Sequence, residues 1–161
     1  MHHFTEQEHV RRENLHKLTE AGIEAYPSAT FEINATAHEI KSNFKEGDST
    51  YQSISLAGRL MSKRIMGKAS FAELQDSSGR IQIYINRDEI CPGEDKILYN
   101  DAFKKWFDLG DFIGIKGFAF YTQMGECTVH VTEIKMLSKS LRPLPVVKKD
   151  DEGNIYDAFT D

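Results

Sequence analysis

Two short alternating runs separated by a turn constrain this chain more than any other feature. Residues 70–75 (SFAELQ) alternate between small or aliphatic side chains and larger or polar ones, and residues 81–85 (IQIYI) place three isoleucines on one side. A period of two is typical of a strand with one buried face. Ser78 and Gly79 between the runs are a turn signal, so the stretch predicts an antiparallel hairpin whose isoleucine side faces a core.

Phe71 is the residue that this pattern does not explain, because its ring falls on the polar side with Glu73 and Gln75. A two-residue loop predicts that Gln75 lies opposite Gln82. It also predicts that Glu73 lies opposite Tyr84. Phe71 and Gln82 then share the outer face without a bulge. An outward ring has two interpretations, packing under a neighbouring loop or helix and binding a ligand, and the hairpin alone favours neither.

Three more strands and a helix are predicted around this hairpin. One strand comes before it, at residues 54–60, and two come after it, at residues 112–122 and 127–138. Ahead of the last two strands, Asn100 or Asp101 can cap a short helix with aromatic residues on one side. Three strands, a helix and two strands is the order of the OB-fold, a five-stranded, partly open barrel. The predicted fold class is therefore all-β with flanking helices.

Two capping boxes predict helices ahead of the barrel. Thr5 begins the first box (TEQE) and predicts a helix over residues 6–21. Thr36 begins the second (TAHE) and predicts a short helix that runs toward Phe44. Most of the first helix is charged, so we expect it either to pack weakly on its own domain or to lie against another.

Changes in pattern divide the chain into three parts. We expect an N-terminal helical extension over residues 1–48, the barrel over residues 49–140 and a linker over residues 141–161. The last part has two prolines, a charge cluster and no periodicity, which is typical of a linker. Its few apolar residues have no evident core, so we expect the linker to lead toward a further part of a longer protein.

Charge is unevenly distributed along the chain. The formal net charge is −5, which argues against a protein that holds nucleic acid by its overall charge. Residues 59–87 nevertheless hold six basic residues against two acidic ones. A local basic face suggests a limited contact with a polyanion, although a solvated sheet face would explain the same charges.

No group of residues predicts catalysis, a metal site or a bound cofactor in this chain. Cys91 and Cys127 lack C-x-x-C or paired-histidine spacing, so neither zinc nor a disulfide is expected, and a reducing, cytosolic compartment fits. The N-terminus does not resemble a signal peptide, and no apolar run approaches the ~20 residues of a membrane span. His130 falls on the outward side of its strand, where an ordinary surface histidine is the simpler interpretation. The chain is predicted to bind rather than to react.

The outer face of the hairpin carries residues that suit single-stranded nucleic acid. OB-folds bind single strands on their second and third strands, where bases stack on aromatic rings. Phe71 offers such a ring, Gln82 can donate and accept at a Watson–Crick edge, and Arg64 can donate to a carbonyl oxygen. The candidates for phosphate contacts are Lys63, Lys68 and Arg80.

Several motifs resemble those of one known family. Through "GRLMSKRIMGKASFAELQDSSGRIQIYINRDEI", "FKKWFDLGDFIGIKG" and "LSKSLRPLP", residues 11–145 resemble the N-terminal anticodon-binding domain of bacterial-type class II lysyl-tRNA synthetases. The R-x-M-G-K-x-S-F segment and the L-R-P-L-P ending are specific to the lysine enzymes within this resemblance. Aspartyl- and asparaginyl-tRNA synthetases share the fold but differ at these positions. The loop at residues 91–101 departs from any fixed family pattern.

The resemblance implies roles for four residues. Phe71 would stack on a uridine of the lysine anticodon, Arg64 and Gln82 would read the middle uridine, and Glu126 would hydrogen-bond an anticodon base. The implied partner is the anticodon stem-loop of tRNA(Lys), and the implied parent is a cytoplasmic homodimer that attaches lysine with ATP and magnesium. This chain holds none of the class II catalytic motifs, so we expect it to be inactive alone. The alternative is a stand-alone OB module that binds single-stranded nucleic acid.

Overall fold

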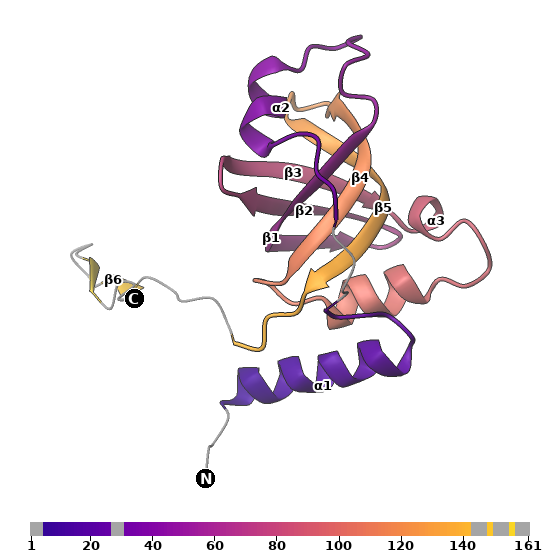
Figure 1. Ribbon diagram of the computed structural model, residues 1–161, viewed down its shortest axis with the longest axis vertical. Coiled ribbons are helices and arrows are strands. Elements are labelled where there is room, and N and C mark those ends of the chain that lie inside the picture. The colour runs from indigo at the N-terminus through magenta and orange to yellow at the C-terminus, as the bar shows by residue number, and fades with distance from the viewer. Residues whose placement is uncertain (1–4, 27–30, 143–147, 150–154, 157–161) are drawn as a thin grey trace.

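Five strands close into a barrel in the computed structural model, which describes residues 5–26, 31–142, 148–149 and 155–156 (Figure 1). Hydrogen-bonded neighbours follow the order β1-β2-β3-β5-β4, and β3 with β5 is the parallel pair in this barrel. The five-stranded OB barrel that the sequence predicts is thereby confirmed. The strands are β1 (Ile54–Met66), β2 (Ala69–Asp76), β3 (Gly79–Asn86), β4 (Phe112–Tyr121) and β5 (Cys127–Ser138).

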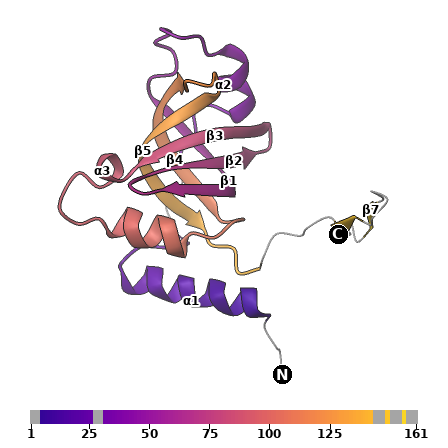
Figure 2. The same ribbon diagram turned by 180° about the vertical axis from the view of Figure 1, so that it is seen from behind.

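Helices cover the two ends of the barrel. Figures 1 and 2 show α2 at one end, whereas α1 and the π-helix η1 lie together at the other. Two short strands near the C-terminus, β6 (Lys148–Lys149) and β7 (Ile155–Tyr156), pair with each other. The helices are α1 (Glu6–Glu20), α2 (Ala37–Asn43), α3 (Arg87–Ile90) and η1 (Leu98–Trp106).

The hairpin of β2 and β3 has the predicted faces but a different register. Glu73 pairs with Gln82, not with Tyr84, and Tyr84 lies opposite Phe71 instead. The cause is the carboxylate of Asp76, which accepts hydrogen bonds from the backbone N–H groups two and three residues further on, at 2.8 and 3.1 Å. These bonds close the turn earlier than predicted. Because the shift is two residues, every side chain keeps its predicted face.

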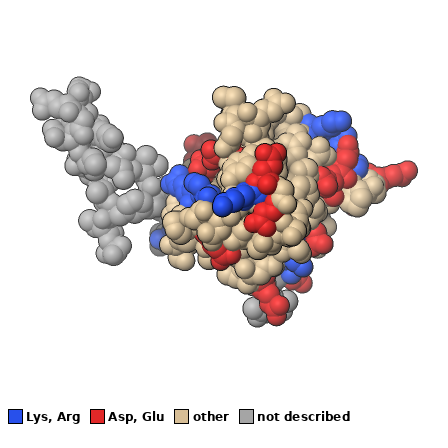
Figure 3. Space-filling view, turned by 90° about the horizontal axis from the view of Figure 1, so that it is seen from above, with Lys and Arg blue, Asp and Glu red and all other residues tan. Residues whose placement is uncertain are grey.

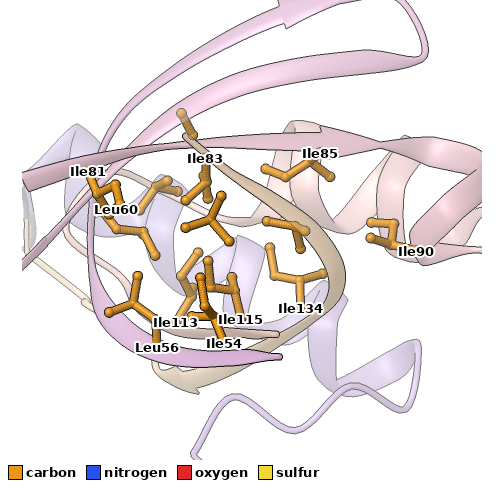
Figure 4. Packing of buried hydrophobic residues seen from close by; sticks show 14 of the residues in the cluster. Ile54, Leu56, Leu60, Ile81, Ile83, Ile85, Ile90, Ile113, Ile115 and Ile134 are labelled. Atoms are coloured by element: carbon orange, nitrogen blue, oxygen red, sulfur yellow. The ribbon is translucent and has the colours of Figure 1, made fainter. Parts of the chain in front are cut away.

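The isoleucine side of the hairpin forms the core, as predicted. Ile81, Ile83 and Ile85 are at most 1% exposed, and they meet apolar side chains from the other strands inside the barrel (Figure 4). On β4, Gly117 lets the strands close, because a Cβ there would lie 1.9 Å from the carbonyl oxygen of His130 on β5. The core and this close approach together fix where the outer faces of β3, β4 and β5 lie.

The helix between β3 and β4 differs from the prediction in start and type. It begins at Leu98, ahead of Asn100 and Asp101, and is a π-helix. The cause lies upstream, where the carboxylate of Asp95 accepts a hydrogen bond from the N–H of Ile97 at 2.9 Å and starts the turn early. The short helix α3 before it was not predicted.

The N-terminal helix begins where the sequence predicts and packs on its own domain. Buried polar side chains, rather than a broad apolar face, hold α1 in place. Asn14 on α1 donates to both carboxylate oxygens of Asp108, at 3.1 and 3.0 Å. The ammonium of Lys139 lies between Asp108 and Asp111, at 2.5 and 2.7 Å, and is fully buried. This network joins α1, the segment after η1 and the end of β5.

The three predicted domain ranges stay a prediction, and much of the predicted linker lies outside the described residues. None of the helices in the described part of the chain is long and apolar enough to span a membrane.

Candidate nucleic-acid interface

A hollow of about 500 Å³ opens on the outer face of the barrel, between the β2–β3 hairpin and the β4–β5 hairpin. It is lined by all four residues that the sequence and the resemblance single out for base contacts: Arg64, Phe71, Gln82 and Glu126. They come from four different segments of the chain. Their convergence therefore depends on the closed barrel and not on any local motif.

Phe71 and Arg64 lie next to each other in the lining of the hollow. They are cross-strand partners on β2 and β1, and the guanidinium lies 5.3 Å from the centre of the ring. The Phe71 ring is half-buried and Arg64 is exposed. No carboxylate among the described residues pairs with Arg64, so its donors are available to a ligand. The pair thus offers a π-face with hydrogen-bond donors beside it.

Gln82 is held in position by its neighbour on β5. Its Nε2 donates to the hydroxyl of Thr128 at 3.1 Å, and that hydroxyl donates to the carbonyl of Glu126 at 3.1 Å. In this orientation, Oε1 of Gln82 accepts nothing from the described residues. An amide oxygen that is free beside a stacking ring can accept from the N3–H of a uracil.

Glu126 lies on a tight turn between β4 and β5. Thr122 fixes this turn, because its N–H donates to the carbonyl of Glu126 at 3.0 Å while its hydroxyl accepts from the N–H of Glu126 at 3.1 Å. Gly125 has φ +82, a conformation that glycine adopts without strain. The carboxylate of Glu126 is exposed and can only accept hydrogen bonds when ionised.

The three phosphate candidates occupy different environments. Lys68 is exposed at the β1–β2 turn, and Arg80 is exposed on the outer face, where its Nε donates to Oε1 of Gln75 at 2.8 Å. Figure 3 shows basic and acidic side chains interspersed at one end of the molecule. Together with the net charge of −5, Lys68 and Arg80 therefore offer single cations rather than a broad positive field.

Lys63 points away from the hollow. A register shift between Leu60 and Ser62 puts it opposite Ala72, on the inner side of the sheet. Its ammonium donates to the carbonyl oxygens at the end of η1, including that of Phe107 at 2.6 Å. Burial lowers the pKa of Lys63 from 10.5 to about 8. This geometry gives Lys63 a structural role and removes the reason for expecting it on phosphate.

Four rings that the sequence reasoning did not assign to the site extend it beyond Phe71. Tyr84 lies 5.3 Å from Phe71, centre to centre, and 5.2 Å from His130. Phe120 is 6.3 Å from Tyr84, and Phe118 is stacked on His130 at 4.6 Å. Outward aromatic residues at alternate positions of β4 were the available signal. His130, interpreted as an ordinary surface histidine, is part of this cluster.

The barrel and its ring-lined hollow define a class of nucleic-acid-binding domain. A family model described as an OB-fold nucleic acid binding domain matches residues 54–137, which contain β1 to β4 and all of β5 except Ser138, and the chain belongs to this family.

Relatives with established names point to one kind of enzyme. Lysine–tRNA ligase of Porphyromonas gingivalis (strain ATCC 33277) is 58% identical over 98% of this chain. Lysine–tRNA ligase of Christiangramia forsetii is 56% identical over 100% of it, and the heat-inducible lysine–tRNA ligase of Escherichia coli K12 is 46% identical over 88%. The chain spans 27–28% of the length of these relatives.

Proposed function

We propose that this chain recognises the anticodon of tRNA(Lys) as a domain of a lysine–tRNA ligase. The observation that carries the proposal is the convergence of Arg64, Phe71, Gln82 and Glu126 on one hollow. A ring that stacks any base, an amide with a free oxygen and an unpaired guanidinium provide both affinity and base selection.

The chemistry of the bases supports this assignment. Uracil presents two carbonyl oxygens and one N–H on its edge, which match the donors of Arg64 and the acceptor of Gln82. Stacking on Phe71 contributes ~1–3 kcal/mol per base and is indifferent to base identity. Selection therefore depends on the two polar side chains, whereas affinity depends mainly on the ring and on nearby cations.

The remaining parts of the proposal concern the parent protein. By relation to the named ligases, the parent would attach lysine to tRNA(Lys) with ATP and magnesium, as a homodimer in the cytoplasm. Within the described part of the chain, no group of three or more His, Cys, Asp or Glu residues could hold a metal ion. We assign ATP and magnesium to the catalytic domain of the parent.

Titration with anticodon stem-loops tests the proposal. The chain should bind a stem-loop with the lysine anticodon more tightly than the same stem with an unrelated anticodon, as measured by fluorescence anisotropy at fixed salt. Equal binding to every unpaired loop would instead favour a stand-alone module that binds single-stranded nucleic acid. No binding to any loop would refute both.

A further inference from the structure

The chain leaves the last strand of the barrel along a path that is fixed by hydrogen bonds. Residues 139–142, the exit segment, follow β5 at the end of the barrel where α1 and η1 lie (Figures 1 and 2). They belong to no strand or helix, yet both backbone N–H groups and both carbonyl groups of Lys139 and Ser140 are hydrogen-bonded. A chain that leaves a domain ordinarily does so through an exposed segment that few contacts cross.

The partners of these backbone groups come from distant parts of the chain. The N–H of Lys139 donates to the carbonyl of Ala25 at 3.1 Å, and the hydroxyl of Tyr26 donates to the carbonyl of Lys139 at 2.7 Å. The N–H of Ser140 donates to a carboxylate oxygen of Asp111 at 2.8 Å. The direction of the exit segment is therefore set by the segment that follows α1 and by the loop before β4.

A group of buried charged side chains holds the exit segment from inside. The ammonium of Lys139 lies between Asp108 and Asp111, and the side chains of Lys139 and Asp111 are fully buried. Arg11 on α1 donates from Nη1 to the carbonyl of Ser140 at 3.4 Å, while its Nε is buried without a partner among the described residues. Burial raises the pKa of Asp111, although Lys139 and two backbone N–H groups favour the charged form. The desolvation of these groups thus opposes folding.

A buried charge cluster specifies one geometry more effectively than it adds stability. Replacing buried ion pairs by apolar side chains of similar volume is often neutral or stabilising, because desolvation offsets the attraction between the charges. Apolar contacts are non-directional and tolerate small shifts, whereas charged hydrogen bonds with several partners are satisfied in one arrangement. Apolar residues could have held α1 on the barrel, so the charges at this place indicate that the position of the exit segment matters.

The same cluster reaches the strand that carries Arg64. Lys63, the preceding residue on β1, donates to the carbonyl of Phe107 at 2.6 Å, and Asp108 follows directly in the chain. Burial lowers the pKa of Lys63, and the charges of Asp108 and Asp111 act in the opposite direction, which shows that these groups lie close enough to interact. One set of side chains therefore holds both the exit segment and the strand beside the hollow.

We propose that Lys139, Asp108 and Asp111 are positioning residues that fix the direction in which the chain leaves the barrel, and thereby the place of the hollow relative to the reaction site of the parent. They touch no substrate and act through the exit segment. This inference rests on the proposed function, because it assumes that the parent attaches lysine to a tRNA whose anticodon lies in the hollow.

The shape of the substrate gives this position its importance. The anticodon and the end that receives the amino acid lie at opposite ends of a tRNA, so one molecule must reach both sites at once. A fixed exit lets binding of the anticodon bring the other end of the tRNA to one place. A misplacement of about 1 Å at a reaction site can cost about 100-fold in rate.

Two variants of the full-length parent weaken the exit segment to different degrees. Lys139→Met combined with Asp111→Asn removes the buried charge pair but keeps apolar bulk and an amide oxygen that can accept from the N–H of Ser140. Tyr26→Phe removes only the hydroxyl that donates to the carbonyl of Lys139, and Tyr26 is 51% exposed, so the risk to folding is small.

Tyr121→Phe is the matched control. The hydroxyl of Tyr121 also donates to a backbone carbonyl at 2.7 Å, that of Phe44, but it does so at the α2 end of the barrel. Tyr121 is 37% exposed, so the two Tyr→Phe variants remove the same kind of hydrogen bond from comparable surroundings. They differ in whether the exit segment loses a contact.

Three activities of each variant are compared with those of the wild type: binding of the lysine stem-loop, lysine-dependent exchange of pyrophosphate into ATP, and attachment of lysine to whole tRNA(Lys). Binding and exchange should stay unchanged in every variant, because neither needs the two sites to be aligned. Attachment to whole tRNA should fall in kcat/KM by about 10- to 100-fold in the double variant. It should fall by about 2- to 12-fold in Tyr26→Phe, the equivalent of one hydrogen bond, and stay at the wild-type level in Tyr121→Phe.

A hairpin that holds only the acceptor arm of the tRNA separates positioning from stability. It cannot reach the hollow, so all variants should attach lysine to it at the wild-type rate. An equal loss on the hairpin and on whole tRNA would overturn the inference, and so would an equal loss in the two Tyr→Phe variants or no loss in either exit variant. If thermal unfolding shows that the double variant is not folded, the two Tyr→Phe variants decide alone. A wild-type parent that does not attach lysine to tRNA(Lys), or that binds every stem-loop equally, would instead refute the proposed function and the inference with it.

Discussion

Replacing Lys63 by methionine should change how the stability of this domain depends on pH. Lys63 keeps its charge at neutral pH although burial lowers its pKa from 10.5 to about 8. In the unfolded chain the ordinary value returns. Between these two pKa values the unfolded state holds a proton that the folded state has released, so stability rises with pH in this window. A shift of about 2.5 units corresponds to about 3 kcal/mol.

Urea unfolding of the wild type and Lys63→Met at several pH values between 7 and 10.5 measures this rise. Other groups titrate in the same range, so the informative quantity is the difference in unfolding free energy between the two proteins. That difference should move in favour of the wild type by about 2–3 kcal/mol across the window. The methionine variant also leaves the carbonyls at the end of η1 without their donor. This loss lowers its unfolding free energy at every pH and does not change the slope of the difference with pH.

Lys105→Met is the matched control, because the side chain of Lys105 is 68% exposed. Its difference from the wild type should stay flat over the same pH range. A flat difference for Lys63→Met as well would refute the conclusion that Lys63 is half-buried and charged at the end of η1. So would a slope of the opposite sign.

Three further predictions concern binding, folding and activity. Lys68→Ala should flatten the dependence of stem-loop affinity on salt by about one unit in a log–log plot, because it removes one phosphate contact, whereas Phe71→Ala should weaken binding without changing that slope. Identical slopes for the two variants would contradict the assignment of Lys68 to phosphate and Phe71 to a base. Gly117→Ala should destabilise the fold by more than about 4 kcal/mol in urea unfolding, because its Cβ would lie 1.9 Å from the His130 carbonyl oxygen, and a variant of near-native stability would contradict the described packing of β4 on β5. The chain alone should not exchange pyrophosphate into ATP in the presence of lysine, and exchange by a preparation free of the intact ligase would overturn its assignment as an anticodon domain.

Local alternation was sufficient to predict the faces of the hairpin but not its register. The side chains of Phe71 and Gln82 point outward as expected, because a period of two survives any shift by two residues. The register depended on the carboxylate of Asp76, which closes the turn early. Hydrogen bonds of this kind compete with the turn that the sequence pattern favours, and their outcome is not visible in periodicity.

The candidate site was predictable where it lies on the hairpin and less so elsewhere. Lys63 was expected to face phosphates, whereas a register shift in β1 turns it inward, and no composition signal marks that shift. Tyr84, Phe120 and His130 were overlooked as a group because they meet only when β3, β5 and β4 are side by side. Contacts between strands far apart in the chain depend on the closed barrel, so they could not be predicted from one sequence alone.

The most direct measurement of base reading by this domain compares Gln82→Ala and Arg64→Ala on two stem-loops that differ only in the middle anticodon base. On the lysine anticodon, each variant should lose about 1–3 kcal/mol of binding free energy relative to the wild type, by analogy with the discrimination per good base contact. On the stem-loop with a different middle base, the loss should shrink, because the contacts that the variants remove are no longer made. Equal loss on both stem-loops would mean that Gln82 and Arg64 contact only the RNA backbone, and would contradict the assignment of this hollow as the place where the anticodon is read.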